Sequence, residues 1–249
     1  MAVGRLLTIV VVVIILYLLI SWLMSDGSSL LPSSYPLPAN KAIKIDAKKL
    51  KTGTANNFAM SCWFFVSNWD THFGQEKVIY QRIDSDGNLA LKMALDKYEN
   101  NLIVDVGTYA LDCSPGNSGA PGSSSGSGCK KHQQCVVQNV PLQRWVNALV
   151  SVYGRSLDIY IDGKLVRTCV LKNTAYVPSG VPMTVCPNGI GFGGQIANFK
   201  YYNDAKNPQE AWNIYADGFG GSVLSNLFNK YYIQVKFFID DEAQGSFRI

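Results

Sequence analysis

The alternation of apolar and polar side chains is clearest between Leu142 and Leu171. A period of two residues is typical of strands that bury one face. Asp162-Gly163 separates two alternating runs, and this dipeptide favours a tight hairpin because both central residues of such a turn need positive φ. The segment therefore predicts three consecutive antiparallel strands.

Further strands are predicted by the same kind of pattern. They are Phe58–Val66, Val78–Arg82, Leu89–Leu95, Asn101–Val106 and Tyr231–Asp240. Because only 16% of the residues are charged, few helices with a charged outer face are expected. We expect an all-β fold, an antiparallel two-sheet β-sandwich of the jelly-roll kind. The last strand is expected to complete a sheet of this domain, and the alternative is pairing with a neighbouring protein.

The N-terminal segment from Leu6 to Met24 carries no charge and is dominated by Leu, Ile and Val. As a helix it is long enough to cross a hydrocarbon core of about 30 Å. A signal peptide would have a shorter apolar region and a small-x-small cleavage site, which SWLMSDGSS does not offer. We therefore predict a transmembrane anchor within residues 1–25. Arg5 before it and Asp26 after it favour a cytosolic N-terminus, with the domain on the far side of the bilayer.

Residues 26–40 are rich in Pro and Ser and have no apolar periodicity, which predicts an extended linker. The sandwich is expected over residues 41–249. It begins with the lysine-rich segment KAIKIDAKKLK (41–51). These lysines indicate either a contact with anionic lipids or an edge strand that is kept soluble by charge.

Three segments together resemble the laminin G-like members of the concanavalin A-like lectin/glucanase superfamily. They are Trp145 with DIYIDGKLV (158–166), FAMSCWFFV (58–66), and residues 190–218, where a Gly-rich turn precedes a strand and a short helix. The resemblance covers roughly residues 41 to 218. It implies a lectin-like β-sandwich, but a fold of this kind does not by itself specify a ligand.

A Gly/Ser/Pro-rich, Cys-rich insertion spans residues 113–135. The disulfide candidates are Cys113, Cys129, Cys135, Cys169 and Cys186. Cys169 with Cys186 is one plausible pair, and Cys113 or Cys129 with Cys135 is another. The alternative for the insertion is a zinc site that uses its three cysteines and His132, although the two-residue Cys spacing of zinc knuckles is absent. Cys62 is expected to be a free thiol in the core.

Asp84, Asp86 and Asn88 place oxygen atoms at alternate positions, as in the start of a calcium loop. The bidentate Glu of an EF-hand is absent, since Leu95 occupies the twelfth position. The alternative is a β-turn that uses Asp and Gly for backbone reasons. Calcium is the one cofactor that the sequence leaves open.

The sequence contains no recognisable catalytic motif. Glucanases of the resembling superfamily carry paired carboxylates on one strand, whereas Glu76, Glu99, Glu210 and Glu242 are far apart here. Neither His72 nor His132 comes with a nucleophile motif, and there is no P-loop. The stretch GIGFGG (189–194) superficially resembles a Gly-rich phosphate loop, but it precedes a strand rather than a helix and is interpreted as a turn. We expect a protein that is not an enzyme, with Glu210 stabilising the start of a helix.

Two kinds of binding function remain. The first is structural assembly by protein–protein docking, as in a virion component that links membrane and capsid. A single-span protein with this fold and no Asn-x-Ser/Thr site resembles structural proteins of large DNA viruses. The second is glycan binding at the surface of a cell or virion, for which the candidate ligand residues are Trp69, His72, Tyr109 and Tyr153. The net charge of +4 is spread along the chain and does not indicate nucleic acid.

Overall fold

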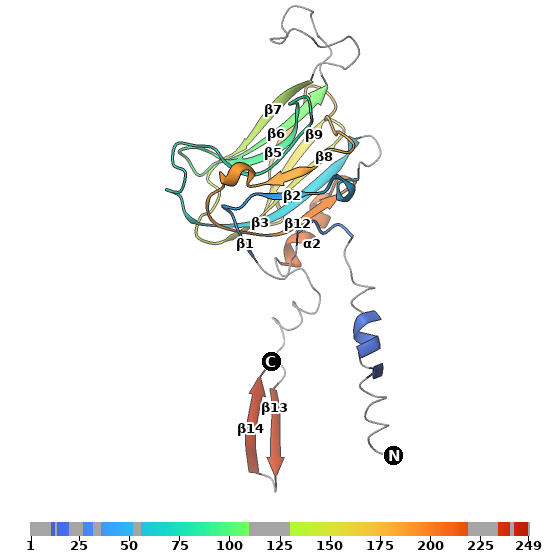
Figure 1. Cartoon of the computed structure of the whole chain (residues 1–249), viewed down its shortest axis with the longest axis vertical. Coiled ribbons are helices and arrows are strands. Elements are labelled where there is room, and N and C mark those ends of the chain that lie inside the picture. The colour runs from blue at the N-terminus through green and yellow to red at the C-terminus, as the bar shows by residue number, and fades with distance from the viewer. Residues whose placement is uncertain are drawn as a thin grey trace, which may run out of the picture.

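The computed structural model describes residues 11–12, 14–19, 27–31, 36–51, 56–109, 130–218, 234–239 and 242–248. Two antiparallel six-stranded sheets face one another and enclose one apolar core (Figure 1). The predicted antiparallel β-sandwich is therefore confirmed.

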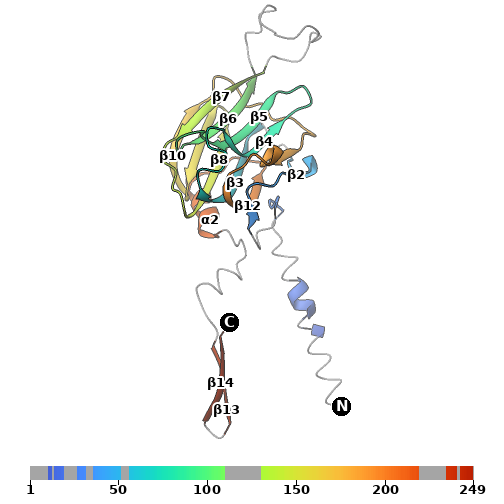
Figure 2. The ribbon, with the colours of Figure 1, turned by 60° about the vertical axis from the view of Figure 1, so that its left-hand side comes forward.

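Each sheet is described by the order of its strands. The first sheet runs β1 (Leu37–Pro38), β12 (Gly193–Tyr202), β3 (Phe58–Asn68), β8 (Trp145–Tyr153), β9 (Ser156–Ile161), β10 (Lys164–Val170). The second sheet runs β2 (Ile43–Ile45), β11 (Met183–Val185), β4 (Lys77–Ile83), β5 (Leu89–Leu95), β6 (Leu102–Tyr109), β7 (Lys130–Val137). Figure 2 shows β7 and β10 along one side of the sandwich and β2 along the other. Edge strands β7 and β10, which belong to different sheets, thus lie next to each other.

The β8–β9–β10 segment has the structure that its alternation predicts. Val150 and Val152 point into the core between the sheets, whereas Leu149 points outward. Asp162 and Gly163 have φ values of 50° and 73° and form the turn between β9 and β10. The same period of two residues thus supplies both the core and the outer face of this sheet.

Helix α2 (Pro208–Ala216) covers part of the outer face of the first sheet. Its N-cap Asn207 accepts a hydrogen bond from the backbone N–H of Glu210, and the Glu210 carboxylate accepts one from the backbone N–H of Asn207. Trp63 of β3 is buried and stacks on Tyr215 of α2, with ring centroids 5.6 Å apart. The predicted carboxylate in the first turn of the helix is therefore present.

The predicted linker is partly built into the sandwich. Leu30 and Leu31 are buried, and the backbone N–H of Leu30 donates to the carbonyl oxygen of Phe199 at 2.7 Å. β1 pairs with β12 and becomes the edge of the first sheet. Within the predicted extended linker (26–40), residues 27–31 and 37–38 therefore find partners on β12 and in the core.

The N-terminal helix is described only at residues 11–12 and 14–19. Within the described parts of the chain, no helix has both the length and the apolar character needed to cross a bilayer. The rest of the predicted anchor, residues 6–10, 13 and 20–24, lies outside the described residues.

The C-terminal segment does not extend the sandwich. β13 (Gln234–Ile239) pairs with β14 (Glu242–Arg248) in a separate two-stranded sheet (Figure 1). The expectation that this strand completes a sheet of the domain is therefore wrong, because its hydrogen-bonding partner is the strand that follows it in the chain.

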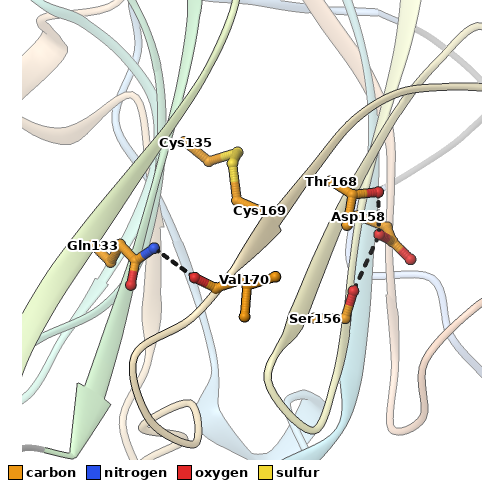
Figure 3. Close-up of a disulfide and its surroundings, with 7 residues drawn as sticks. All are labelled: Gln133, Cys135, Ser156, Asp158, Thr168, Cys169 and Val170. Carbon is orange, nitrogen blue, oxygen red and sulfur yellow. Dashed lines mark hydrogen bonds between the residues drawn. A yellow bond between two sulfur atoms is a disulfide. The ribbon is translucent and has the colours of Figure 1, made fainter.

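One disulfide joins Cys135 of β7 to Cys169 of β10, and it therefore links the two sheets at their adjacent edges (Figure 3). Next to it, the Gln133 side-chain amide donates to the carbonyl oxygen of Val170 at 2.9 Å. The expected pairs of Cys169 with Cys186 and of Cys135 with an insertion cysteine are wrong, since strand pairing brings Cys135 and Cys169 together instead. The predicted four-ligand zinc site is incompatible with this disulfide, because Cys135 is not available as a thiolate.

The remaining cysteines fall into two groups. Cys62 and Cys186 are free and buried, which confirms the expected core thiol at Cys62. Cys113 and Cys129 lie outside the described residues.

Candidate functional site

A row of polar side chains crosses the outer face of the second sheet. Its members occupy register positions opposite one another on β4, β5, β6 and β7; they are Gln81, Lys92, Asp105 and Gln134. Their neighbours Leu91 and Val104 point the other way, into the core. The alternation along each strand therefore aligns four polar residues on one face.

The centre of this row is a compact cluster of charges. The Lys92 ammonium lies 2.9 Å from both carboxylate oxygens of Glu76 and 2.9 Å from Oδ2 of Asp105. Burial lowers the pKa of Lys92, but its hydrogen bonds to Glu76 and Asp105 outweigh that effect and the pKa is raised. Lys92 is therefore held in its charged form between two carboxylates.

Asp105 keeps one acceptor unused in the described structure. Its side chain is only 3% exposed, and its Oδ1 has no hydrogen-bond partner. Nδ1 of His132, on a side chain that is 65% exposed, lies 3.7 Å from this oxygen, beyond hydrogen-bond distance. A buried acceptor without a partner is uncommon and costs about 1–3 kcal/mol.

These residues line a groove of about 410 Å³, a size typical of ligand sites. Gly107 is the register partner of His132 and places no side chain beside it. A Cβ at Gly107 would collide with the carbonyl oxygen of Leu89, so this position requires glycine for the approach of β5.

Asp84 lies beyond one end of the groove, where Lys130 reaches it. Its carboxylate accepts hydrogen bonds from the Tyr176 hydroxyl (2.7 Å), the Lys130 ammonium (3.3 Å) and the backbone N–H of Asn88 (2.8 Å). Burial raises the pKa of Asp84, but hydrogen bonds from Tyr176, Asn88 and Lys130 lower it more, so the pKa lies well below its usual value.

The geometry at Asp84 favours the turn alternative over a calcium loop. Another hydrogen bond to Asp84 comes from the backbone N–H of Asp86 at 2.9 Å. The ammonium of Lys130 already supplies the positive charge at this carboxylate. Among the described residues, no group of three or more His, Cys, Asp or Glu side chains is arranged to hold a metal ion.

The four aromatic and His residues predicted as ligand contacts do not gather in one place. Trp69 and His72 share the loop between β3 and β4. The Lys77 ammonium lies 4.4 Å from the centroid of the Trp69 ring, and His72 Nδ1 lies 3.1 Å from the carbonyl oxygen of Gly191. Both predicted residues therefore already have partners within the protein.

Tyr109 and Tyr153 lie on different sheets. Tyr109, at the end of β6, is the register partner of Lys130 and packs edge-to-face on Tyr176 with ring centroids 5.5 Å apart. Tyr153, at the end of β8, is 68% exposed. None of the four predicted residues lines the groove, although Lys130, the register partner of Tyr109, does.

Sequence reasoning missed the Glu76–Lys92–Asp105 cluster because its members lie far apart along the chain. Strand register brings them together, and no short motif encodes register. One signal was present: Lys92 and Asp105 interrupt otherwise apolar strands, and a charge in such a strand needs a partner. The exposed pair Phe73 and Tyr98, with ring centroids 5.6 Å apart, was missed for the same reason.

Comparisons with known proteins give a likeness of fold. No family model and no curated protein matches the sequence. The structure is similar to the binding domain of botulinum neurotoxin serotype D, with a TM-score of 0.51 and 13% identity over 70% of this chain. It is also similar to the binding domain of botulinum neurotoxin DC in complex with rat synaptotagmin II, with a TM-score of 0.50 and 11% identity over 70% of this chain.

The matched part is 40% of the first of those chains and 39% of the second. At these identities the comparison shows the fold alone. It fits the lectin-like β-sandwich that the resemblance implied, and it assigns no ligand.

Proposed function

We propose that the chain is a non-catalytic binding module whose groove on the second sheet binds a glycan. The observation that carries this proposal is the unused Oδ1 of Asp105 beside the charged Lys92. A sugar hydroxyl donates and accepts hydrogen bonds, so it fits a carboxylate acceptor next to donors such as Lys92 and His132. A donor placed on Asp105 Oδ1 would also remove the cost of leaving that atom unpaired.

The same cluster supports the proposal that the protein is not a glycosidase. Glu76 and Asp105 are the only paired carboxylates of the groove, and the Lys92 ammonium lies between them. A glycosidase needs the space between its two carboxyl groups for the scissile bond. Lys92 occupies that space.

A glycan array probed with the full chain in neutral detergent tests the proposal. We expect specific binding, and Asp105→Asn should weaken it at least tenfold because a hydrogen bond to a charged acceptor is worth about 1.5–3 kcal/mol. Asp158→Asn is the matched control, since Asp158 is a strand aspartate of the other sheet. Binding that is unchanged in Asp105→Asn, or absent from the folded wild type, would refute the proposal. Repeating the array with calcium and with a chelator tests the calcium prediction.

We also propose that residues 6–24 anchor the protein in a membrane as a single-pass segment. The described large apolar side chains at residues 11–12 and 14–19 are each roughly half exposed. A helix that is apolar on all sides is stable in lipid or in a protein core. Extraction of the membrane fraction with alkaline carbonate tests this: the full chain should stay with the lipid, and release into the supernatant would contradict an anchor.

A second candidate function, docking in a structural assembly such as a virion, is favoured by one separate observation. Edge strand β10 exposes three apolar side chains, with Leu165, Val166 and Val170 exposed by 49%, 45% and 67%. An exposed edge strand is a template for pairing with another chain. Replacing Leu165 and Val166 by Lys should abolish assembly in light scattering and leave glycan binding intact, and unchanged assembly would exclude this edge.

A further inference from the structure

A second groove, distinct from the one on the second sheet, opens where the N-terminal part of the chain meets the sandwich. It has a volume of about 360 Å³. Its walls include Lys48, Lys49 and Lys51, together with Tyr202 and Asn203 at the end of β12. The backbone at residues 27–28 closes one side.

The lining of the groove carries three lysines and no acidic residue. Lys48, Lys49 and Lys51 are exposed, and within the described residues none of them forms an ion pair. The nearby Asp46 carboxylate caps the 3-10 turn η1 (Ala47–Lys49) by accepting from the backbone N–H of Lys48 at 2.9 Å. The Lys49 ammonium donates to the carbonyl oxygen of Leu30 at 3.4 Å. Three lysines around a hollow of this size favour a compact anion.

The position of the groove is fixed by residues 27–31. Ser29 forms a β-bridge with Lys200, and the backbone N–H of Tyr201 donates to the carbonyl oxygen of Ser28 at 2.9 Å. The proposed anchor ends at Met24, so only Ser25 and Asp26 separate it from Gly27. Fully extended, the three Cα–Cα steps from Met24 to Gly27 span at most about 10 Å. The polar layer on each side of a bilayer core is several ångströms thick, so the proposed anchor would place the groove at headgroup depth.

We infer that this basic groove binds the phosphate-bearing headgroup of an anionic phospholipid in the membrane that holds the anchor. The phosphate would contact the lysine ammonium groups, and the Tyr202 and Asn203 side chains would lie beside the rest of the headgroup. Bound lipid would hold the sandwich against the bilayer in one orientation. This inference rests on the proposed anchor, and it is independent of the glycan groove.

The test follows the full chain in neutral-detergent micelles during titration with phosphatidylserine. Hydrogen exchange of the amides at residues 27–31 and 47–51 reports occupancy. We expect these amides to become protected. The triple variant Lys48→Gln, Lys49→Gln, Lys51→Gln should need on the order of 100-fold more lipid, because each lysine near an anionic surface contributes about tenfold or less in affinity. The matched control is Lys164→Gln with Arg167→Gln on β10, which should titrate like the wild type.

Further titrations identify the ligand and distinguish the headgroup proposal from the anchor proposal. Equal protection by phosphatidylcholine would overturn recognition of the anionic headgroup. Equal protection by inorganic phosphate would overturn the lipid assignment and make the groove a site for free phosphate. If the triple variant titrates like the wild type, this groove is not the headgroup site. Circular dichroism checks that the variant retains its β structure. Release of the full chain from phosphatidylcholine nanodiscs would refute the anchor, whereas the micelle titration tests the groove in either case.

Discussion

Removal of the Cys135–Cys169 disulfide should destabilise the sandwich by roughly 4 kcal/mol. The two cysteines are 34 residues apart in sequence. In the chain-entropy account, a cross-link stabilises the folded state by restricting the unfolded chain, and the effect grows with the logarithm of the loop length. A loop of this length corresponds to roughly 4 kcal/mol at 25 °C. That is a large share of the 5–15 kcal/mol that separates a typical folded domain from its unfolded chain.

The measurement is urea unfolding of the full chain in neutral detergent, followed by tryptophan fluorescence. Cys113 and Cys129 are replaced by Ala in every protein compared, so that Cys135–Cys169 is the disulfide being varied. The Cys135→Ala, Cys169→Ala variant should unfold at lower urea than the parent. Reduction of the parent should give the same shift and reduction of the variant none. A loss of unfolding free energy below about 1 kcal/mol would refute the predicted contribution of the disulfide. An equal effect of the reductant on the variant would refute it as well.

Three further predictions concern individual groups. Lys92→Ala should lower the free energy of unfolding by about 3 kcal/mol in a urea titration, because it leaves the buried Asp105 carboxylate unpaired; a loss below 1 kcal/mol would contradict this. The folded-state pKa of Asp84 lies below its unfolded value of about 3.9, so its stabilisation is present above about pH 4 and is lost as pH falls toward the folded value. The free energy of unfolding of Asp84→Asn should therefore fall less than that of the wild type as pH is lowered below about 4. An equal fall in both proteins would contradict this prediction. Burial raises the pKa of Cys62 well above its usual value and raises that of Cys186 to about 12. Neither thiol should therefore react with iodoacetamide at neutral pH until the protein is denatured. Peptide mass spectrometry would show the labelled cysteines.

The sandwich was predictable because its information is local. Alternation of apolar and polar residues predicts the strands, and Asp162-Gly163 predicts the turn between β9 and β10. Helix α2 follows from Asn207 and Glu210, since a cap and a first-turn carboxylate act within a few residues of each other. Each of these features depends on neighbours in the chain, which a sequence displays directly.

The groove and the disulfide were not predictable because they depend on which strands become neighbours. Lys92 and Asp105 meet through the register of β5 and β6, and Cys135 meets Cys169 because β7 and β10 are the edges of different sheets. Sequence proximity pointed instead to Cys169 with Cys186. The packing of Leu30 was not predictable for a related reason, because its backbone N–H finds its partner on β12, far away in the sequence.

The disulfide and the N-terminal charges support one orientation of the proposed anchor. Arg5 precedes the apolar segment, which favours a cytosolic N-terminus. That orientation carries the sandwich across the bilayer, where disulfides such as Cys135–Cys169 form and persist, whereas cytosolic thiols are usually kept reduced. The opposite orientation would expose the link between β7 and β10 to reduction and would remove a constraint that holds the two sheets together. The stability of the sandwich and the proposed orientation of the anchor are therefore coupled through the Cys135–Cys169 disulfide.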